Sequence, residues 1–161
     1  MDWLELFNMQ QKLDNYIQEN HQLKSEELFD RKILALLVEV GELANETKCF
    51  KFWSTKPASP QSVILEEYVD GLHFILSIGL DKQYDHLPSK WVEKTKDLTN
   101  LFNIVFEKII AFKHDQSKES YKELIYTYIG LGNALGFSED NVKDAYYEKN
   151  KVNFERQDSG Y

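Results

Sequence analysis

Cysteine is nearly absent from this sequence, which has only Cys49 among its 161 residues. A single cysteine excludes an intrachain disulfide framework. It agrees with a reducing compartment such as the cytoplasm, where thiols persist. A catalytic thiol is conceivable at this position, but a small residue packed between helices is the more frequent use of such a cysteine. We therefore interpret Cys49 as a packing residue.

Long hydrophobic runs are also missing. No uninterrupted apolar stretch could span a bilayer, and the first residues, Met1 to Glu5, lack the basic start and apolar run of a signal peptide. We expect a cytoplasmic protein without a membrane partner.

Basic residues are outnumbered, with 19 Lys and Arg against 27 Asp and Glu, a formal net charge of −8 and a pI near 5.0. This negative field repels nucleic-acid backbones, so we expect no nucleic-acid partner. Free mononucleotides remain possible ligands if metal ions offset the acidic groups locally.

Proline and glycine are sparse, at three and seven residues, and they separate segments whose apolar residues recur at helical spacing. No alternating strand pattern is present. The chain length and the hydrophobic fraction of 42% suit a single domain over residues 1–161. The aromatic fraction of 14% predicts a core rich in Phe and Tyr. The predicted fold is an all-α helical bundle of about six helices.

The boundaries of these helices follow from caps and prolines. Ser25, Ser59, Ser117 and Ser138 are candidate N-caps, and Pro60 suits a first helical position. The expected helices run from Trp3 to about Glu19, from Ser25 to about Cys49, from Gln61 to about Leu80, from Pro88-Ser89 to about Lys113, from Ser117 to Gly136, and onward from Ser138. The third becomes apolar on nearly all sides after Tyr68, which predicts a position in the middle of the bundle or at a subunit interface.

Acidic residues recur at helical spacing in two of these apolar helices. Glu39, Glu42 and Glu46 share one face of the second helix, and Glu67 and Asp70 lie one turn apart on the third. Carboxylates on helices that pack together lose solvation and repel one another unless a cation offsets their charge. Mg²⁺ takes such oxygen ligands and commonly bridges them to substrate phosphates.

A single Glu-x-x-Glu pair is usually a solvated helix face. Two pairs on adjacent helices, each embedded in apolar sequence, indicate a metal site instead. His73 lies one turn after Asp70, but imidazole is a poor ligand for Mg²⁺, so a packed or hydrogen-bonded histidine is the simpler interpretation.

The two acidic motifs resemble those of the all-α NTP pyrophosphohydrolases, a superfamily that includes the MazG-like enzymes and the dimeric dUTPases. Three further segments make the chain similar to the dimeric dUTPase branch. They are Phe50-Lys51-Phe52-Trp53, His73-Phe74-Ile75-Leu76-Ser77, and Lys149-Asn150-x-x-Asn153-x-x-Arg156-Gln157-x-x-Gly160-Tyr161. The last segment is the most specific, and the resemblance weakens between about Asp81 and Lys143.

This resemblance implies hydrolysis of dUTP to dUMP and pyrophosphate by a homodimer with two or more Mg²⁺ ions per active site. The implied metal ligands are Glu39, Glu42, Glu67 and Asp70, with Glu42 or, next, Glu39 as the catalytic base. The implied phosphate-binding residues are Lys149, Asn153, Arg156, Tyr161 and Lys51. Without the resemblance, the C-terminal members of this set would be interpreted as an exposed polar helix end.

The deoxyuridine nucleoside is expected to contact Gln10, Asp14, Trp53, His73 and Phe74. Gln10 would hydrogen-bond the base, Trp53 would stack on it, and the Phe74 ring would leave no room for a 2′-hydroxyl. Asp14 departs from the family, which has an amide here, and a carboxylate accepts hydrogen bonds rather than donating them. A dCTP or broader NTP pyrophosphohydrolase therefore stays open as an alternative, as does a non-enzymatic helical interaction protein. The second alternative is weakened because Glu39, Glu42, Glu67, Asp70 and Arg156 are all present.

Overall fold

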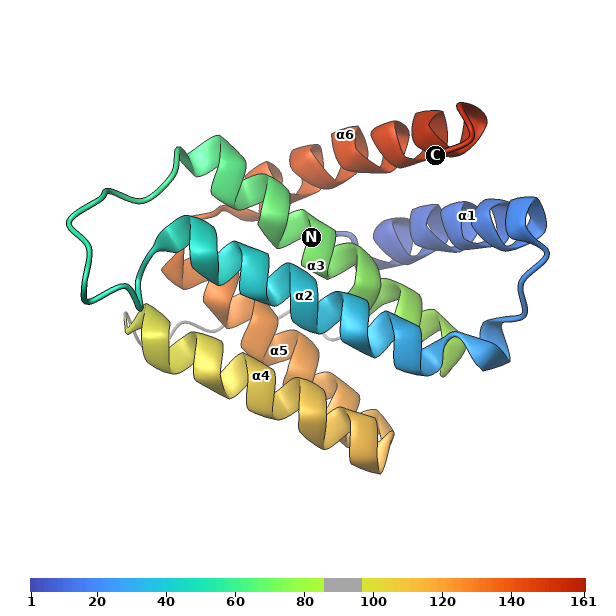
Figure 1. The fold of residues 1–161 in the computed structure, drawn as a ribbon. Helices are drawn as coiled ribbons and strands as arrows, with labels where there is room; N and C mark the ends of the chain where they lie inside the picture. Colours follow the sequence, from blue (N-terminus) through green and yellow to red (C-terminus); the bar gives the residue numbers. More distant parts are fainter. Residues whose placement is uncertain (86–96) are drawn as a thin grey trace.

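In the computed structural model, residues 1–85 and 97–161 are described, and they form six α-helices and no strand (Figure 1). The helices are α1 (Trp3–His21), α2 (Phe29–Thr47), α3 (Gln61–Asp81), α4 (Leu98–Asp115), α5 (Lys118–Ala134) and α6 (Glu139–Asp158). The predicted all-α bundle is confirmed. Within these two described ranges, no helix has the length and apolar character needed to cross a bilayer.

Two of the predicted helix starts are confirmed by their caps. The Ser117 hydroxyl accepts a hydrogen bond from the Ser120 N–H at 3.1 Å, and the Ser138 hydroxyl accepts one from the Asn141 N–H at 3.1 Å. The Asn141 side-chain oxygen in turn accepts a hydrogen bond from the Ser138 N–H at 3.2 Å, which completes a capping box. Each cap satisfies N–H groups that the first helical turn leaves without a partner.

Three other predicted boundaries have a different outcome. Residues Ser25–Glu27 form a 3-10 turn, so α2 starts only at Phe29, after Leu28. Pro60, not Ser59, is the N-cap residue of α3, and the Ser59 hydroxyl donates a hydrogen bond to the Glu46 carboxylate instead of capping the helix. The predicted start of the fourth helix at Pro88-Ser89 lies outside the described residues.

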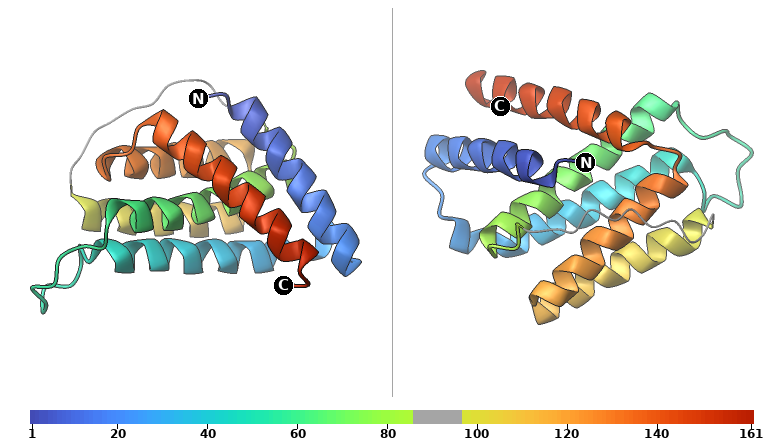
Figure 2. Two further views of the ribbon diagram at one scale, coloured as in Figure 1. Left: turned by 90° about the horizontal axis from the view of Figure 1, so that it is seen from above. Right: turned by 180° about the vertical axis from the view of Figure 1, so that it is seen from behind.

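Helix α3 is the centre of the bundle. It packs along α2 and also contacts α1, α5 and α6, while α4 and α5 pair as a hairpin (Figures 1 and 2). Helices α1 and α6 lie side by side over α3, on the side away from that hairpin (Figure 2). The apolar surroundings of α3 are thus provided within the chain, which confirms the prediction of a central helix.

Buried tyrosines hold α3 against α5. The rings of Tyr68 and Tyr128 stack with centroids 4.6 Å apart. Each hydroxyl donates to the other residue's backbone carbonyl, Tyr68 to Tyr128 at 3.0 Å and Tyr128 to Tyr68 at 2.6 Å. Both rings lie over glycines of the facing helix, Gly71 and Gly132, where a Cβ atom would lie 2.2 and 2.5 Å from a tyrosine oxygen. The predicted Phe- and Tyr-rich core is confirmed.

Candidate active site

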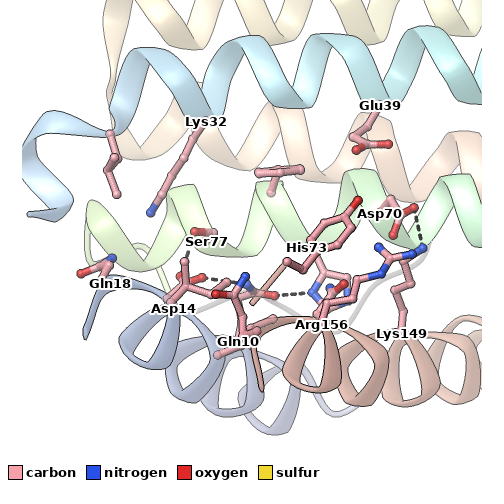
Figure 3. Close-up of a pocket in the computed structure, with 17 residues that line it drawn as sticks. Gln10, Asp14, Gln18, Lys32, Glu39, Asp70, His73, Ser77, Lys149 and Arg156 are labelled. Carbon is pink, nitrogen blue, oxygen red and sulfur yellow. Dashed lines mark hydrogen bonds and ion pairs between the residues drawn. The ribbon is translucent and has the colours of Figure 1, made fainter. Parts of the chain in front are cut away.

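A pocket of about 380 Å³ opens between α1, α2, α3 and α6 (Figure 3). Ten of the residues predicted from the sequence to form the site line it. They are Gln10, Asp14, Glu39, Asp70, His73, Phe74, Lys149, Asn153, Arg156 and Tyr161.

The pocket is elongated, because its lining residues on α2 and on α3 extend over two helical turns of each helix. Lys32 and Glu39 on α2 are seven residues apart, as are Asp70 and Ser77 on α3, which separates each pair by about 10 Å along its helix. We call the end at Glu39 and Asp70 the acidic end, and the end at Asp14, Lys32 and Ser77 the lysine end. Figure 3 shows the two ends on opposite sides of His73.

Three carboxylates meet at the acidic end. Glu39 offers an oxygen from α2, and Glu67 and Asp70 offer theirs from α3, all within 4.8 Å of one another. Burial, with Asp70 and Glu42 nearby, raises the pKa of Glu39 from 4.5 to about 7. Burial also raises the pKa of Glu67, and the charge of Asp70 adds to that rise. Burial likewise raises the pKa of Asp70. These carboxylates therefore oppose one another's ionisation, as expected where a cation is needed.

The other two acidic residues of α2 lie at the edge of this group. Glu42 is exposed and is not one of the three clustered carboxylates, although it contributes to the raised pKa of Glu39. Glu46 accepts a hydrogen bond from the Ser59 hydroxyl, which ties the end of α2 to the start of α3. Glu42 is thus beside the cluster and open to solvent.

The raised pKa values predict that the metal-free protein loses stability as pH rises. Glu39 binds its proton more tightly in the folded chain, with a pKa of about 7 against an ordinary value of 4.5. Between those two values the folded state holds more protons than the unfolded state, so each increase in pH favours unfolding. The loss is absent below about pH 4.5 and complete above about pH 7.

Urea unfolding in EDTA at pH 4.5 and pH 8 measures this loss. The Glu39→Gln variant cannot ionise at this position and should show a smaller decrease between the two pH values than the wild type. An equal decrease in the two proteins would contradict the assignment.

Basic groups from α6 border the same carboxylates. The Lys149 ammonium contacts Asp70 at 3.0 Å and Glu66 at 2.9 Å, and the hydrogen bond from Lys149 opposes the rise in the pKa of Asp70. The Arg156 guanidinium lies 5.1 Å from the Tyr161 ring centroid, and both side chains line the pocket. The predicted phosphate-binding residues of the C-terminal segment therefore all line the pocket, with Lys149 at its acidic end.

A buried hydrogen-bond chain forms the wall between the two ends. Gln10 Oε1 accepts from the Tyr146 hydroxyl at 2.6 Å and is 2.6 Å from His73 Nδ1. Because the amide oxygen can only accept, His73 Nδ1 carries the proton and Nε2 is the acceptor. Burial lowers the pKa of His73 to about 3, so the ring is neutral, and it stacks on Tyr146 with centroids 4.1 Å apart. The predicted hydrogen-bonding role of His73 agrees with this geometry.

The same chain continues to Asp14 at the lysine end. The Asp14 carboxylate accepts from Gln10 Nε2 at 2.9 Å and from the Ser77 hydroxyl at 2.8 Å. Burial raises the pKa of Asp14, and the charge of Lys32 is the largest influence that opposes this. Asp14 is therefore held in one orientation by two donors.

Four predicted residues do not line the pocket, and two of these, Glu42 and Glu67, lie beside its acidic end. The other two are distant from it. Lys51 and Trp53 lie in the segment between α2 and α3, which projects from the end of the bundle (Figure 1). The Trp53 side chain is 64% exposed and contacts the rings of Phe50 and Phe52, with centroids 6.0 and 5.0 Å away. These ring contacts lie inside the projecting segment itself, and the predicted stacking of Trp53 on the base stays a prediction.

The structure adds pocket residues that were not predicted as site residues, notably Lys32 and Ser77, and it adds Tyr146 behind His73. The signal for the first two was present in the sequence. Each lies seven residues from a predicted carboxylate and so on the same helical face, two turns away. Tyr146 carried no such signal, because its contact depends on how α6 packs against α3.

The comparison with known families agrees with this geometry. A family model described as dUTPase matches residues 2–161, nearly the whole chain. The chain belongs to the dUTPase family. The match confirms the predicted all-α dUTPase and its activity, the hydrolysis of dUTP to dUMP and pyrophosphate. A search of curated proteins finds no match. This dUTPase therefore has carboxylates and basic groups arranged along one pocket.

Proposed function

We propose that this dUTPase is Mg²⁺-dependent and binds dUTP along the pocket, with the triphosphate at the acidic end and the base at the lysine end. The observation that carries the proposal is the meeting of Glu39, Glu67 and Asp70 within 4.8 Å beside Lys149. Carboxylates and basic groups at one end of a pocket suit metal-bridged phosphates.

The donor set fits Mg²⁺. All three side chains offer hard oxygen ligands, and none of the clustered groups is sulfur or imidazole. Their raised pKa values indicate that each is destabilised as an anion without a cation. Exposed Glu42, one turn from Glu39 on α2, completes the predicted ligand set of Glu39, Glu42, Glu67 and Asp70. Two or more Mg²⁺ ions held there would offset the phosphate charge and polarise the attacking water.

The protein's own groups then have distinct tasks. Glu42 accepts the proton of the attacking water, because it is the one member of the set that is open to solvent, and Glu39 is the alternative base. Arg156, Lys149 and Asn153 donate hydrogen bonds to phosphate oxygens, and Tyr161 adds a neutral donor. Lys149 moves from Asp70 to the phosphates when a metal ion offsets the carboxylate.

The nucleoside occupies the remainder of the pocket. Phe74 lines it between the two ends and lies against the deoxyribose, while Gln10 and Asp14 face the base. Gln10 Oε1 is already occupied by His73 and Tyr146, so its contribution is limited to an N–H group. Lys51 and Trp53 have no place in this arrangement within one chain, and their predicted contacts with phosphate and base remain predictions.

We also propose that the enzyme is a cytoplasmic homodimer. Most of α3 is covered within the bundle, so we look for the partner surface elsewhere. Helix α2 instead exposes Leu34 at 63% and Val38 at 50%, four residues apart on one face. An aliphatic pair of this kind suits a subunit interface. Sedimentation velocity tests this, with a dimer expected and a monomer at micromolar concentration contradicting it.

Titration of the EDTA-treated enzyme with Mg²⁺ in the presence of α,β-imido-dUTP tests the metal site. The imido bridge resists hydrolysis, so binding is measured without turnover. We expect at least two Mg²⁺ per chain in the wild type, and weaker binding in Glu67→Gln. Saturation of the wild type with fewer than two Mg²⁺, or unchanged affinity in the variant, would contradict the proposed site.

A further inference from the structure

Lys32 is a buried lysine that the reaction described above does not use. Lys32 belongs to α2 and is 9% exposed. It lines the pocket at the end opposite the carboxylate cluster. Burying an ammonium group costs free energy unless the charge is paired. Lys32 Nζ contacts Asp81 Oδ2 at 2.5 Å, which offsets that cost.

The pairing with Asp81 leaves part of the ammonium available. A lysine offers three N–H donors, and Asp81, which does not line this pocket, accepts one of them. In Figure 3 the Lys32 side chain extends from α2 toward the side of the pocket where Asp14 and Ser77 lie. The influence of Lys32 on the pKa of Asp14 agrees with that direction. Among the described residues, however, Lys32 and Asp14 do not form a direct ion pair.

Asp14 supplies the complementary acceptor. An ionised carboxylate can accept about four hydrogen bonds, and Gln10 and Ser77 supply one to each oxygen. The lysine end of the pocket thus presents fixed donors from Lys32 opposite fixed acceptors on Asp14. A planar ligand edge with an acceptor next to a donor fits between them.

We propose that Lys32 is the residue that distinguishes uracil from cytosine in this enzyme, by donating a hydrogen bond to O4 of the base while Asp14 accepts one from N3–H. The inference rests on the proposed placement of the triphosphate at the acidic end. With the sugar directed toward that end, the ring edge opposite the glycosidic bond enters the lysine end, and this edge carries C4 and N3.

Cytosine has the opposite pattern on that edge. Its exocyclic amine would face the Lys32 ammonium, donor against donor, and its unprotonated N3 would face the Asp14 carboxylate, acceptor against acceptor. Sites built around buried polar groups reject a ligand that leaves those groups unpaired. The lysine therefore explains how a carboxylate at position 14 is compatible with selection of dUTP.

The test compares the wild type with Lys32→Met, which keeps an unbranched apolar stem and removes the donors. Substrates are dUTP, dCTP, 4-thio-dUTP and 2-thio-dUTP, because sulfur is a weak hydrogen-bond acceptor. We expect Lys32→Met to lower kcat/KM for dUTP about 10- to 100-fold, mainly through KM, and to leave dCTP unchanged or improved. Replacement of O4 by sulfur should raise the wild-type KM and have little further effect in Lys32→Met, whereas 2-thio-dUTP should behave like dUTP in both.

Two variants separate this role from a structural one. Asp81→Asn breaks the ion pair but keeps the lysine, and should lower stability while preserving the dUTP preference. Lys12→Met, on the exposed face of α1, should change neither the stability nor the preference for dUTP. Equal losses for dUTP and dCTP in Lys32→Met, or an undiminished 4-thio effect in that variant, would overturn the proposal.

If Lys32→Met does not fold, the thio-substituted substrates are compared with the wild-type enzyme alone. Sensitivity to 4-thio substitution with tolerance of 2-thio supports the proposal, and the reverse pattern overturns it. Dissociation constants of dUMP, dCMP and the thio-monophosphates give the same comparison without turnover or metal. Failure of Mg²⁺-dependent hydrolysis is therefore distinguishable from failure of base discrimination.

Discussion

Replacement of Asp70 by Asn is expected to lower dUTP turnover on the order of 1,000-fold while the helical fold is retained. Loss of an outer partner of a metal ligand typically costs 10- to 100-fold, and loss of a direct anionic ligand should cost more. Asp70 also contacts Lys149 at 3.0 Å, so the change disturbs a proposed phosphate-binding group as well. Steady-state turnover at saturating Mg²⁺ and circular dichroism measure the two parts of this expectation.

The same Asp70→Asn change should not lower the stability of the metal-free protein, and should raise it if it has any effect. Burial raises the pKa of Asp70, which means that the fold disfavours its anion, and a neutral amide relieves that cost. Above pH 7, Asp70→Asn should unfold at an equal or higher urea concentration than the wild type. The matched control is Glu148→Gln, an exposed carboxylate on α6, which should leave turnover unchanged. Turnover within a few fold of the wild type in Asp70→Asn would remove Asp70 from the metal site.

Replacement of Gly71 by Ala is expected to destabilise the fold by about 1–3 kcal/mol. The added Cβ would lie 2.2 Å from the Tyr128 hydroxyl oxygen and 3.0 Å from its ring carbon Cζ. Tyr128 is fully buried and stacked on Tyr68, so it cannot move aside without breaking its hydrogen bond to the Tyr68 carbonyl. Overpacking of this kind costs about 1–3 kcal/mol and the lost hydrogen bond about 1, against a gain of about 1 from helix propensity.

Gly41→Ala is the matched control, because Gly41 is also inside a helix but has no atom within 4 Å of an added Cβ. That variant should gain about 0.5–1 kcal/mol in unfolding free energy. A second variant, Gly71→Ala with Tyr128→Phe, removes the closest contact and should be less destabilised than the sum of the single changes. Equal stabilities for Gly71→Ala and Gly41→Ala would show that the α3–α5 contact is looser than the structure indicates.

The sequence predicted the bundle and most of the pocket because both depend on helical periodicity. Glu39 and Asp70 could be placed on inward faces from spacing alone, and the caps at Ser117 and Ser138 follow local chemistry that the structure confirms. The capping prediction at Ser25 was wrong because residues 25–27 form a separate 3-10 turn before α2. Local side-chain preference does not determine how many residues such a connection needs.

Contacts between helices distant in sequence could not be predicted in this way. Nothing in the pattern near Tyr146 indicates that its ring stacks on His73, which lies on a different helix. The pairing of Lys32 with Asp81 likewise requires the antiparallel packing of α2 on α3. Trp53 shows the limit of a family motif, since the motif suggests a base contact but does not place the segment between α2 and α3, and Trp53 does not line the pocket.

Pyrophosphate release from dUTP, dCTP, dTTP and UTP, each with Mg²⁺ and with EDTA, tests the central claim most directly. The claim is that the clustered carboxylates hold Mg²⁺ and that the lysine end selects uracil. We predict rapid release from dUTP with Mg²⁺, little release from the other three nucleotides, and no release from any of them in EDTA. Release from dUTP that persists in EDTA would contradict the metal site, and equal release from dCTP would contradict the assignment of base selection to Lys32 and Asp14.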